Sequence, residues 1–152
     1  MQLNSFFTPV GLITITELKE HLVSLRWGKT NKCSRTPLIS ETVRQLNAYF
    51  QGKLEVFDLP IQTQGTSFQK KVWVALDKIA YGQTLSYSQL ASLTESGPRA
   101  IGGACRANPI PIIIPCHRVL KKNGKLGGYS GGNGINTKRF LIDLELRKKG
   151  LI

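Results

Sequence analysis

The clearest structural pattern of the chain lies at residues 86–107, which read SYSQLASLTESGPRAIGGACRA. Ser86 and Gln89 have the spacing of a capping box, in which each side chain bonds to a backbone amide at the start of a helix. Pro98 suits the first turn of a second helix, where its missing amide hydrogen removes no bond. We therefore expect two short helices joined by a tight turn, as in a helix-turn-helix.

The second of these helices, expected over residues 99–107, carries Gly102 and Gly103 in its middle. Each glycine costs a helix roughly 1 kcal/mol relative to alanine, so something should require the missing side chains. Close packing against another helix is one explanation, and close approach to a nucleic-acid backbone or groove is the other. Arg99 and Arg106, one at each end of the helix, favour the second explanation.

Upstream, Thr66 and Gln69 form another capping-box match and open a helix that should end near Gly82. Its apolar face would be made by Phe68, Val72, Leu76 and Ile79. Nearer the N-terminus, residues 10–16 and 22–27 alternate apolar and polar positions, which predicts a β-hairpin. A helix should follow over residues 39–50 and stop at Gly52, and a third strand is expected around residues 54–59.

These elements predict an α/β chain of the α+β kind. A small N-terminal domain made of a sheet and a helix would span residues 1–60. Residues 61–65 would form the linker between the two domains. Residues 66–152 would form a mainly helical domain with a helix-turn-helix and a reactive cysteine. The N-terminus lacks the basic start and apolar stretch of a secretory signal, and no apolar run is long enough to span a bilayer. We therefore expect an unexported, cytoplasmic protein.

The charge of the chain is strongly positive and unevenly distributed. The formal net charge is +12, from 21 Lys and Arg against 9 Asp and Glu. Residues 1–60 hold 7 basic and 5 acidic residues, whereas residues 61–152 hold 14 and 4. Such an excess favours a polyanionic partner, nucleic acid before membrane, although charge alone is equally compatible with a basic surface kept for solubility.

The three cysteines are Cys33, Cys105 and Cys116. An odd number without a secretory signal predicts reduced thiols rather than a disulfide framework. Structural zinc is not expected, because the chain has no CxxC motif and only two histidines. No metal and no cofactor are therefore predicted.

Cys116 lies in the segment NPIPIIIPCHRV at residues 108–119. The prolines favour extended backbone and the isoleucines must be buried, so a rigid apolar segment should deliver Cys116 to a fixed place. A buried lone cysteine is usually only a small hydrophobe. His117 and Arg118, however, can supply a base and positive potential, which would lower the thiol pKa and populate the nucleophilic thiolate.

Neighbouring residues point in different directions, so His117 would reach the sulfur of Cys116 through a bridging water. The imidazole also needs a carboxylate to fix its tautomer, for which Glu145 on a C-terminal helix is the candidate and Asp143 the alternative. The more common state of such a glutamate is an exposed side chain on a basic helix.

PCHRV at residues 115–119, RAIGGACRANPIPIII before it and GGYSGG at residues 127–132 closely resemble the active-site region of the O6-alkylguanine-DNA alkyltransferases. The resemblance extends from about Thr66 to Glu145, and the N-terminal pattern fits the small first domain of that family. It implies direct-reversal repair: a single, irreversible transfer of the alkyl group from O6-alkylguanine, and also from O4-alkylthymine, in double-stranded DNA after base flipping. It further implies a monomer without an obligate protein partner or a membrane, associated with the nucleoid when bound to DNA.

The resemblance also implies roles for individual residues. The catalytic ones would be the alkyl acceptor Cys116, the base His117, its partner Glu145, the bracing Asn108, and Tyr87, which could protonate the departing purine. The base pocket would be lined by Tyr87, Val119, Tyr129, Ser130 and Cys105. DNA would be contacted by Arg99, which would replace the flipped nucleotide in the stack, and by Ala100, Gly102, Gly103, Arg106 and Arg118, with Ala104 also permitting close approach.

Three departures from the family pattern stand out. The turn between Leu93 and Arg99 is about two residues shorter, the segment after Tyr129 is about two residues longer, and Cys105 replaces a larger apolar residue, which could admit bulkier alkyl groups. Other functions compatible with the sequence are a non-catalytic reader of alkylated DNA, a cysteine hydrolase or acyltransferase using a Cys116, His117 and Glu145 triad, and a plain helix-turn-helix regulator.

Overall fold

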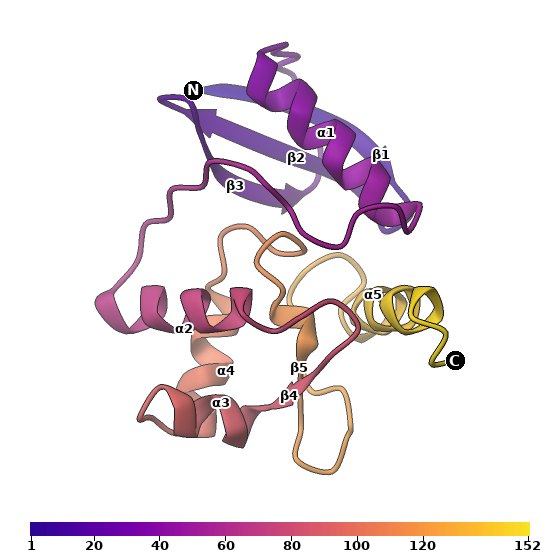
Figure 1. The fold of residues 1–152 in the computed structure, drawn as a ribbon. Coiled ribbons are helices and arrows are strands. Elements are labelled where there is room, and N and C mark those ends of the chain that lie inside the picture. Colours follow the sequence, from indigo (N-terminus) through magenta and orange to yellow (C-terminus); the bar gives the residue numbers. More distant parts are fainter. The chain divides into compact units, whose positions relative to one another are not determined.

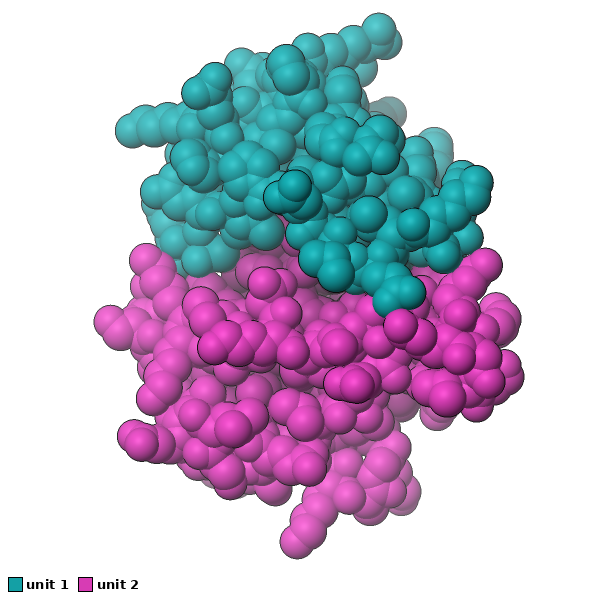
Figure 2. All heavy atoms as spheres, in the orientation of Figure 1, with its two compact units in different colours: residues 1–64 teal, residues 65–152 magenta.

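The computed structural model describes residues 1–152 and divides them into two compact units, residues 1–64 and residues 65–152 (Figures 1 and 2). The first unit is a small sheet with one helix, and the second is mainly helical. The α+β class predicted from the sequence is confirmed. None of the helices combines the length and apolar character needed to cross a membrane.

The first unit begins with an antiparallel sheet of β1 (Gln2–Thr8), β2 (Gly11–Leu18) and β3 (His21–Trp27), in that order. The predicted hairpin is confirmed as β2 and β3, which turn at Lys19 and Glu20 with positive φ angles of 50° and 63°. The sequence did not predict β1. Its side chains are mostly half-buried on both faces, so the alternation that marks a one-sided strand is missing.

Helix α1 (Pro37–Phe50) confirms the helix predicted at residues 39–50. The strand predicted at residues 54–59 is wrong, because the Gln45 side chain of α1 bonds to both backbone groups of Asp58 at 2.9 Å. Backbone groups held in this way need no strand partner. The chain touches the sheet only afterwards, where Leu22 bonds to the Pro60 carbonyl and to the Gln62 amide. Residues 61 and 62, assigned to a linker from the sequence, are thus attached to β3.

The second unit contains α2 (Ser67–Asp77), β4 (Leu85–Ser86), α3 (Tyr87–Leu93), α4 (Pro98–Arg106), the 3-10 turn η1 (Cys116–Arg118), β5 (Val119–Leu120) and α5 (Ile135–Lys148). Both predicted capping boxes form, at Thr66 and at Ser86. Helix α2 ends at Asp77, before the expected stop near Gly82, and the following turn buries Ile79 and Tyr81. Helices α3 and α4 pack together as the predicted pair of helices (Figure 1).

The segment between α4 and β5 runs through the core of the second unit. Its four isoleucines are all buried, namely Ile110, Ile112, Ile113 and Ile114. Strand β5 then pairs in parallel with β4, placing Val119 opposite Leu85 and Leu120 opposite Ser86. The core therefore fixes η1 at both ends, and Ser86 ties this segment to the start of α3.

Candidate active site

Cys116 opens the 3-10 turn η1 directly after Pro115, and its side chain is buried. Asn108 fixes the approach to it. The side-chain nitrogen Nδ2 of Asn108 donates to the Ile114 carbonyl at 2.8 Å, and its side-chain oxygen Oδ1 accepts from the Ile110 backbone amide at 3.0 Å. The Asn108 side chain therefore holds the turn before Cys116 at both ends.

His117 and Glu145 are brought together in the interior. The His117 Nε2 atom lies 2.6 Å from Glu145 Oε2, and both side chains are almost completely buried. The structure thus pairs His117 with Glu145 and not with Asp143. Because the carboxylate accepts the proton on Nε2, the neutral ring carries its lone pair on Nδ1, which is buried and has no protein partner.

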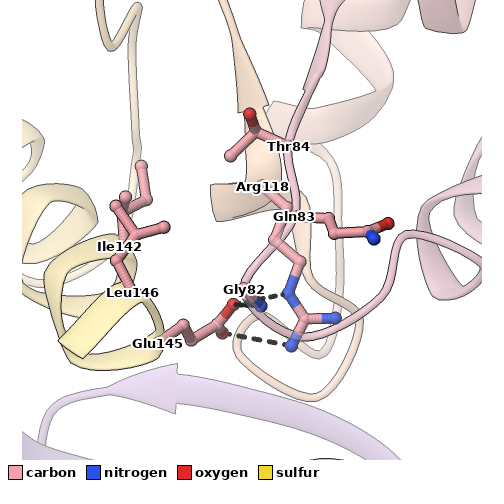
Figure 3. Close-up of a pocket in the computed structure, with 7 residues that line it drawn as sticks. All are labelled: Gly82, Gln83, Thr84, Arg118, Ile142, Glu145 and Leu146. Carbon is pink, nitrogen blue, oxygen red and sulfur yellow. Dashed lines mark hydrogen bonds and ion pairs between the residues drawn. The ribbon is translucent and has the colours of Figure 1, made fainter. Parts of the chain in front are cut away.

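Arg118 completes this network from the other side. It donates to Glu145 from Nε at 2.8 Å and from Nη2 at 3.1 Å, while Nη1 donates to the Ile79 carbonyl at 2.6 Å. The Gly82 amide gives Glu145 a further bond of 3.2 Å. Figure 3 shows Gly82, Arg118 and Glu145 among the residues that line a shallow pocket, which Cys116 does not line.

The geometry contradicts one expectation for Arg118, which the sequence placed at the DNA. The side chain is buried, and Glu145 and Ile79 occupy its guanidinium, so it cannot reach a phosphate. Its positive charge is directed at Glu145 rather than at the thiol. Arg118 therefore holds the histidine partner in place, and its buried guanidinium is not presented at the surface.

Burial and hydrogen bonding act against each other in this network. Burial alone would raise the pKa of Glu145, but bonds from His117 and Arg118 lower that pKa to about 2. Burial lowers the pKa of His117, and Glu145 only partly offsets this effect. Glu145 is consequently ionised and His117 neutral, which leaves Nδ1 ready to accept a proton.

The thiol of Cys116 is protonated at rest. Burial raises its pKa, whereas the Asn108 side chain and the positive charge of Lys138 act in the opposite direction. No hydrogen bond joins Cys116 directly to His117. A proton leaving the sulfur must therefore travel through an intermediary to reach Nδ1, consistent with the water bridge expected from the sequence.

Lys138 is a site residue that the sequence analysis missed. It is fully buried on α5, and its Nζ atom lies 3.3 Å from both the Tyr87 hydroxyl and the Gly128 carbonyl. Burial lowers its pKa, and negative charge on Cys116 or Cys105 raises it. One signal was available, since Lys138 precedes Glu145 by about two helical turns and so shares its helix face.

Three of the predicted pocket residues interact electrostatically with Cys116. Burial, followed by the charges of Cys105 and Cys116, raises the pKa of Tyr87 to about 12. Burial and then Cys116 raise the pKa of Cys105, also to about 12. The pKa of Tyr129 is raised by burial and by Cys116. These groups lie close enough to interact electrostatically when they are ionised. Val119 is buried and Ser130 is exposed.

Helix α4 presents its glycines outward. A Cβ atom built on Gly102 or Gly103 would meet only the Arg106 guanidinium, at 3.7 Å and 3.8 Å. No other helix packs there, so close helix packing does not explain these glycines. Arg99, Ala100 and Arg106 are exposed.

The expectation for Ala104 is wrong, because this residue faces the interior. It is buried, and its carbonyl accepts a bond of 2.9 Å from the Trp73 indole. Helix α4 therefore offers an open strip at Gly102 and Gly103 on one side and is tied to α2 on the other.

Comparison with known proteins agrees with this site. Models described as the 6-O-methylguanine DNA methyltransferase DNA-binding domain and ribonuclease-like domain match residues 67–147 and 4–63. The methylated-DNA–protein-cysteine methyltransferase of Mycobacterium tuberculosis H37Rv is 44% identical over 147 residues, which cover 91% of this chain and 88% of that protein. The constitutive enzyme of Bacillus subtilis is 38% identical over 151 residues, covering 91% of each.

Among solved structures, Mycobacterium tuberculosis OGT in complex with DNA matches with a TM-score of 0.88 and 41% identity, covering 97% of this chain and 94% of that one. The structure of the O6-methylguanine methyltransferase of the same organism gives a TM-score of 0.86 and 39% identity, with coverage of 97% and 93%. The chain belongs to the 6-O-methylguanine DNA methyltransferase family.

Proposed function

We propose that this protein repairs DNA by direct reversal, moving the alkyl group of O6-alkylguanine to the sulfur of Cys116. The observation that carries the proposal is the buried Cys116 next to the neutral His117, whose Nδ1 atom has no hydrogen-bond partner. Glu145 and Arg118 hold His117 in this state. Family membership supplies the substrate class. The same chemistry extends to O4-alkylthymine, which also carries its alkyl group on an exocyclic oxygen of the base.

The reaction needs no cofactor. Water relays the thiol proton of Cys116 to Nδ1 of His117, and Glu145 stabilises the imidazolium that results. The thiolate attacks the alkyl carbon, a carbon–sulfur bond forms, and the bond between that carbon and O6 breaks. The electron pair passes to the guanine, and a proton delivered from Tyr87 leaves normal guanine. Lys138, bonded to the Tyr87 hydroxyl, stabilises the phenolate until it is reprotonated.

Each protein molecule is inactivated by a single transfer. The product is a thioether, which water does not hydrolyse, so one protein removes one alkyl group. A hydrolase built on Cys116, His117 and Glu145 would instead turn over repeatedly. The geometry disfavours that alternative, because no hydrogen bond links the sulfur to the imidazole and the histidine follows the cysteine directly in the chain.

Access to the alkyl carbon requires base flipping, since the carbon lies inside the duplex. We place the DNA along α4, with Gly102 and Gly103 allowing close approach and Arg99, Ala100 and Arg106 at the surface. Arg99 would take the place of the extruded nucleotide. The guanine would enter the space bounded by Tyr87, Val119, Tyr129, Ser130 and Cys105.

The second unit thus supplies both the chemistry and the DNA contacts, and residues 66–152 form the repair domain. We propose that the protein acts as a monomer without an obligate protein partner. Its place of work is the cytoplasm, at the chromosomal DNA that it repairs.

Transfer of label from DNA tests the proposal. Duplex DNA with a radiolabelled methyl group on the guanine O6 oxygen should leave at most one equivalent of label on the peptide that contains Cys116. The Cys116→Ser variant should take up no label yet bind the duplex as tightly as the parent. Repeated turnover would indicate a hydrolase, and binding without transfer by the parent would indicate a reader or a regulator.

A further inference from the structure

Three lysines lie on one short turn that the repair chemistry does not use. The turn spans residues 121–125, and we call it the lysine turn after Lys121, Lys122 and Lys125. The Lys121 amide donates to the Lys125 carbonyl at 2.8 Å, and the Gly124 amide donates to the Lys121 carbonyl at 2.9 Å. The Asn123 side chain accepts from the Lys125 amide at 3.1 Å. The backbone of the turn is therefore locked, although all five residues are exposed.

The lysine turn lies next to the start of the helix pair. Strand β5 pairs in parallel with β4, and parallel strands end at the same edge, so the turn leaves β5 where α3 begins. On its far side the chain returns to the same place, because a Cβ atom on Gly127 would lie 3.1 Å from the Tyr87 hydroxyl. Figure 1 draws this segment as the orange loop beyond β5, at the end of the second unit where α3 lies.

The positive charge of the turn is not neutralised within the protein. None of its lysines forms an ion pair, and Glu95 is the one acidic residue of the segment that holds α3 and α4. Arg99 and Arg106 are exposed on the same helix pair. Neighbouring ammonium groups without an acidic partner repel one another. Binding an anion from outside the protein relieves this repulsion and is therefore favourable.

We propose that the lysine turn is a phosphate-binding site that grips the DNA backbone beside the helix-turn-helix and so extends the DNA contact beyond α4. The inference rests on the proposed function, because the duplex bound along α4 brings its phosphates to this end of the unit. Lysine binds phosphate as a mobile point charge and reads no base. The lysine turn therefore adds affinity and salt dependence, but neither sequence preference nor chemistry.

The test compares two double variants that each remove two charges from the second unit. One is Lys121→Gln with Lys122→Gln, and the other is Arg147→Gln with Lys148→Gln at the exposed end of α5, which lies away from α3 (Figure 1). Affinity for an unmodified duplex is measured by fluorescence anisotropy between about 50 and 200 mM NaCl, the range over which phosphate contacts dominate. Thermal melting confirms that both variants are folded.

Each lost phosphate contact should reduce the slope of log K against log salt by about 0.9. The magnitude of the negative slope should therefore be smaller by about 1.8 in the lysine-turn variant than in the parent, and should change much less in the α5 variant. Equal losses in the two variants would overturn the inference. Transfer from free O6-benzylguanine, which needs no DNA, should keep the parental rate in both variants. If the parent itself fails to transfer or to bind duplex, the proposed function fails first, and the inference with it.

Discussion

The interior around Cys116 and the surface around α4 are built on opposite principles. In the interior, Glu145 accepts bonds from His117, Arg118 and Gly82, and most polar groups are paired. On the surface, Arg99 is exposed, and Gly102 and Gly103 face nothing but the Arg106 side chain. The interior fixes one geometry for chemistry, whereas the surface stays open for a partner to complete. Each region should therefore fail in its own way when it is altered.

Glu145→Gln should have the largest effect, and this effect should be on the rate of alkyl transfer and not on DNA binding. The amide cannot stabilise an imidazolium as a carboxylate does, so alkyl transfer should slow by about 100-fold, within the range of general-base contributions. DNA affinity should stay at the parental value. Rapid-quench transfer and anisotropy would measure the two quantities.

Asp143→Asn is the matched control, because it removes the neighbouring carboxylate and leaves the His117 bond intact. A slowing as large as that of Glu145→Gln would show that the lost negative charge matters rather than the bond.

The same glutamate should make the fold sensitive to acid. Its pKa is lowered from 4.5 to about 2 in the folded protein, so its stabilising contribution is complete above about pH 4.5 and is lost as the pH falls towards 2. The shift corresponds to about 3 kcal/mol. Urea unfolding at several pH values should show this loss in the parent and in Asp143→Asn. Glu145→Gln should show less of it, the remainder coming from the buried His117, whose pKa is also lowered. An equally steep loss in that variant would assign the acid sensitivity elsewhere.

Arg99→Ala should weaken the surface region by a smaller amount. Removing the side chain that fills the emptied stack should reduce affinity for a methylated duplex and the rate of its repair, each by about tenfold, or about 1.4 kcal/mol. Arg147→Ala removes an exposed arginine from α5 and should change neither quantity by more than twofold. Equal losses in both variants would mean that only net charge matters.

Cys105→Met should give the smallest effect, because it changes only the shape of the base pocket. If the small side chain admits bulky alkyl groups, the larger one should lower the rate for benzyl relative to methyl substrates by a few fold, as expected for small changes in pocket volume. Cys33→Ser, in the first unit, serves as the control. If the ratio of benzyl to methyl transfer rates is unchanged in Cys105→Met, the small size of Cys105 does not serve to admit bulky alkyl groups.

The sequence predicts those parts of the molecule that short-range patterns control. Capping boxes at Thr66 and Ser86 act within three residues, and both form. The burial of Arg118, the role of Lys138 and the inward face of Ala104 depend on residues 31 to 51 positions away in the chain. The false strand at residues 54–59 has the same origin, since a distant glutamine side chain replaced the expected pairing. Family resemblance supplied the pairing of His117 with Glu145, which spacing alone left open.

The most direct test of this division of labour is the rate of transfer to Cys116 from two substrates, free O6-benzylguanine and methylated duplex DNA. Glu145→Gln should slow both reactions by a similar factor, because both use the same buried base. Arg99→Ala should slow the duplex reaction and leave that of the free base at the parental rate. A loss of free-base transfer in Arg99→Ala as large as its loss on the duplex would contradict the account.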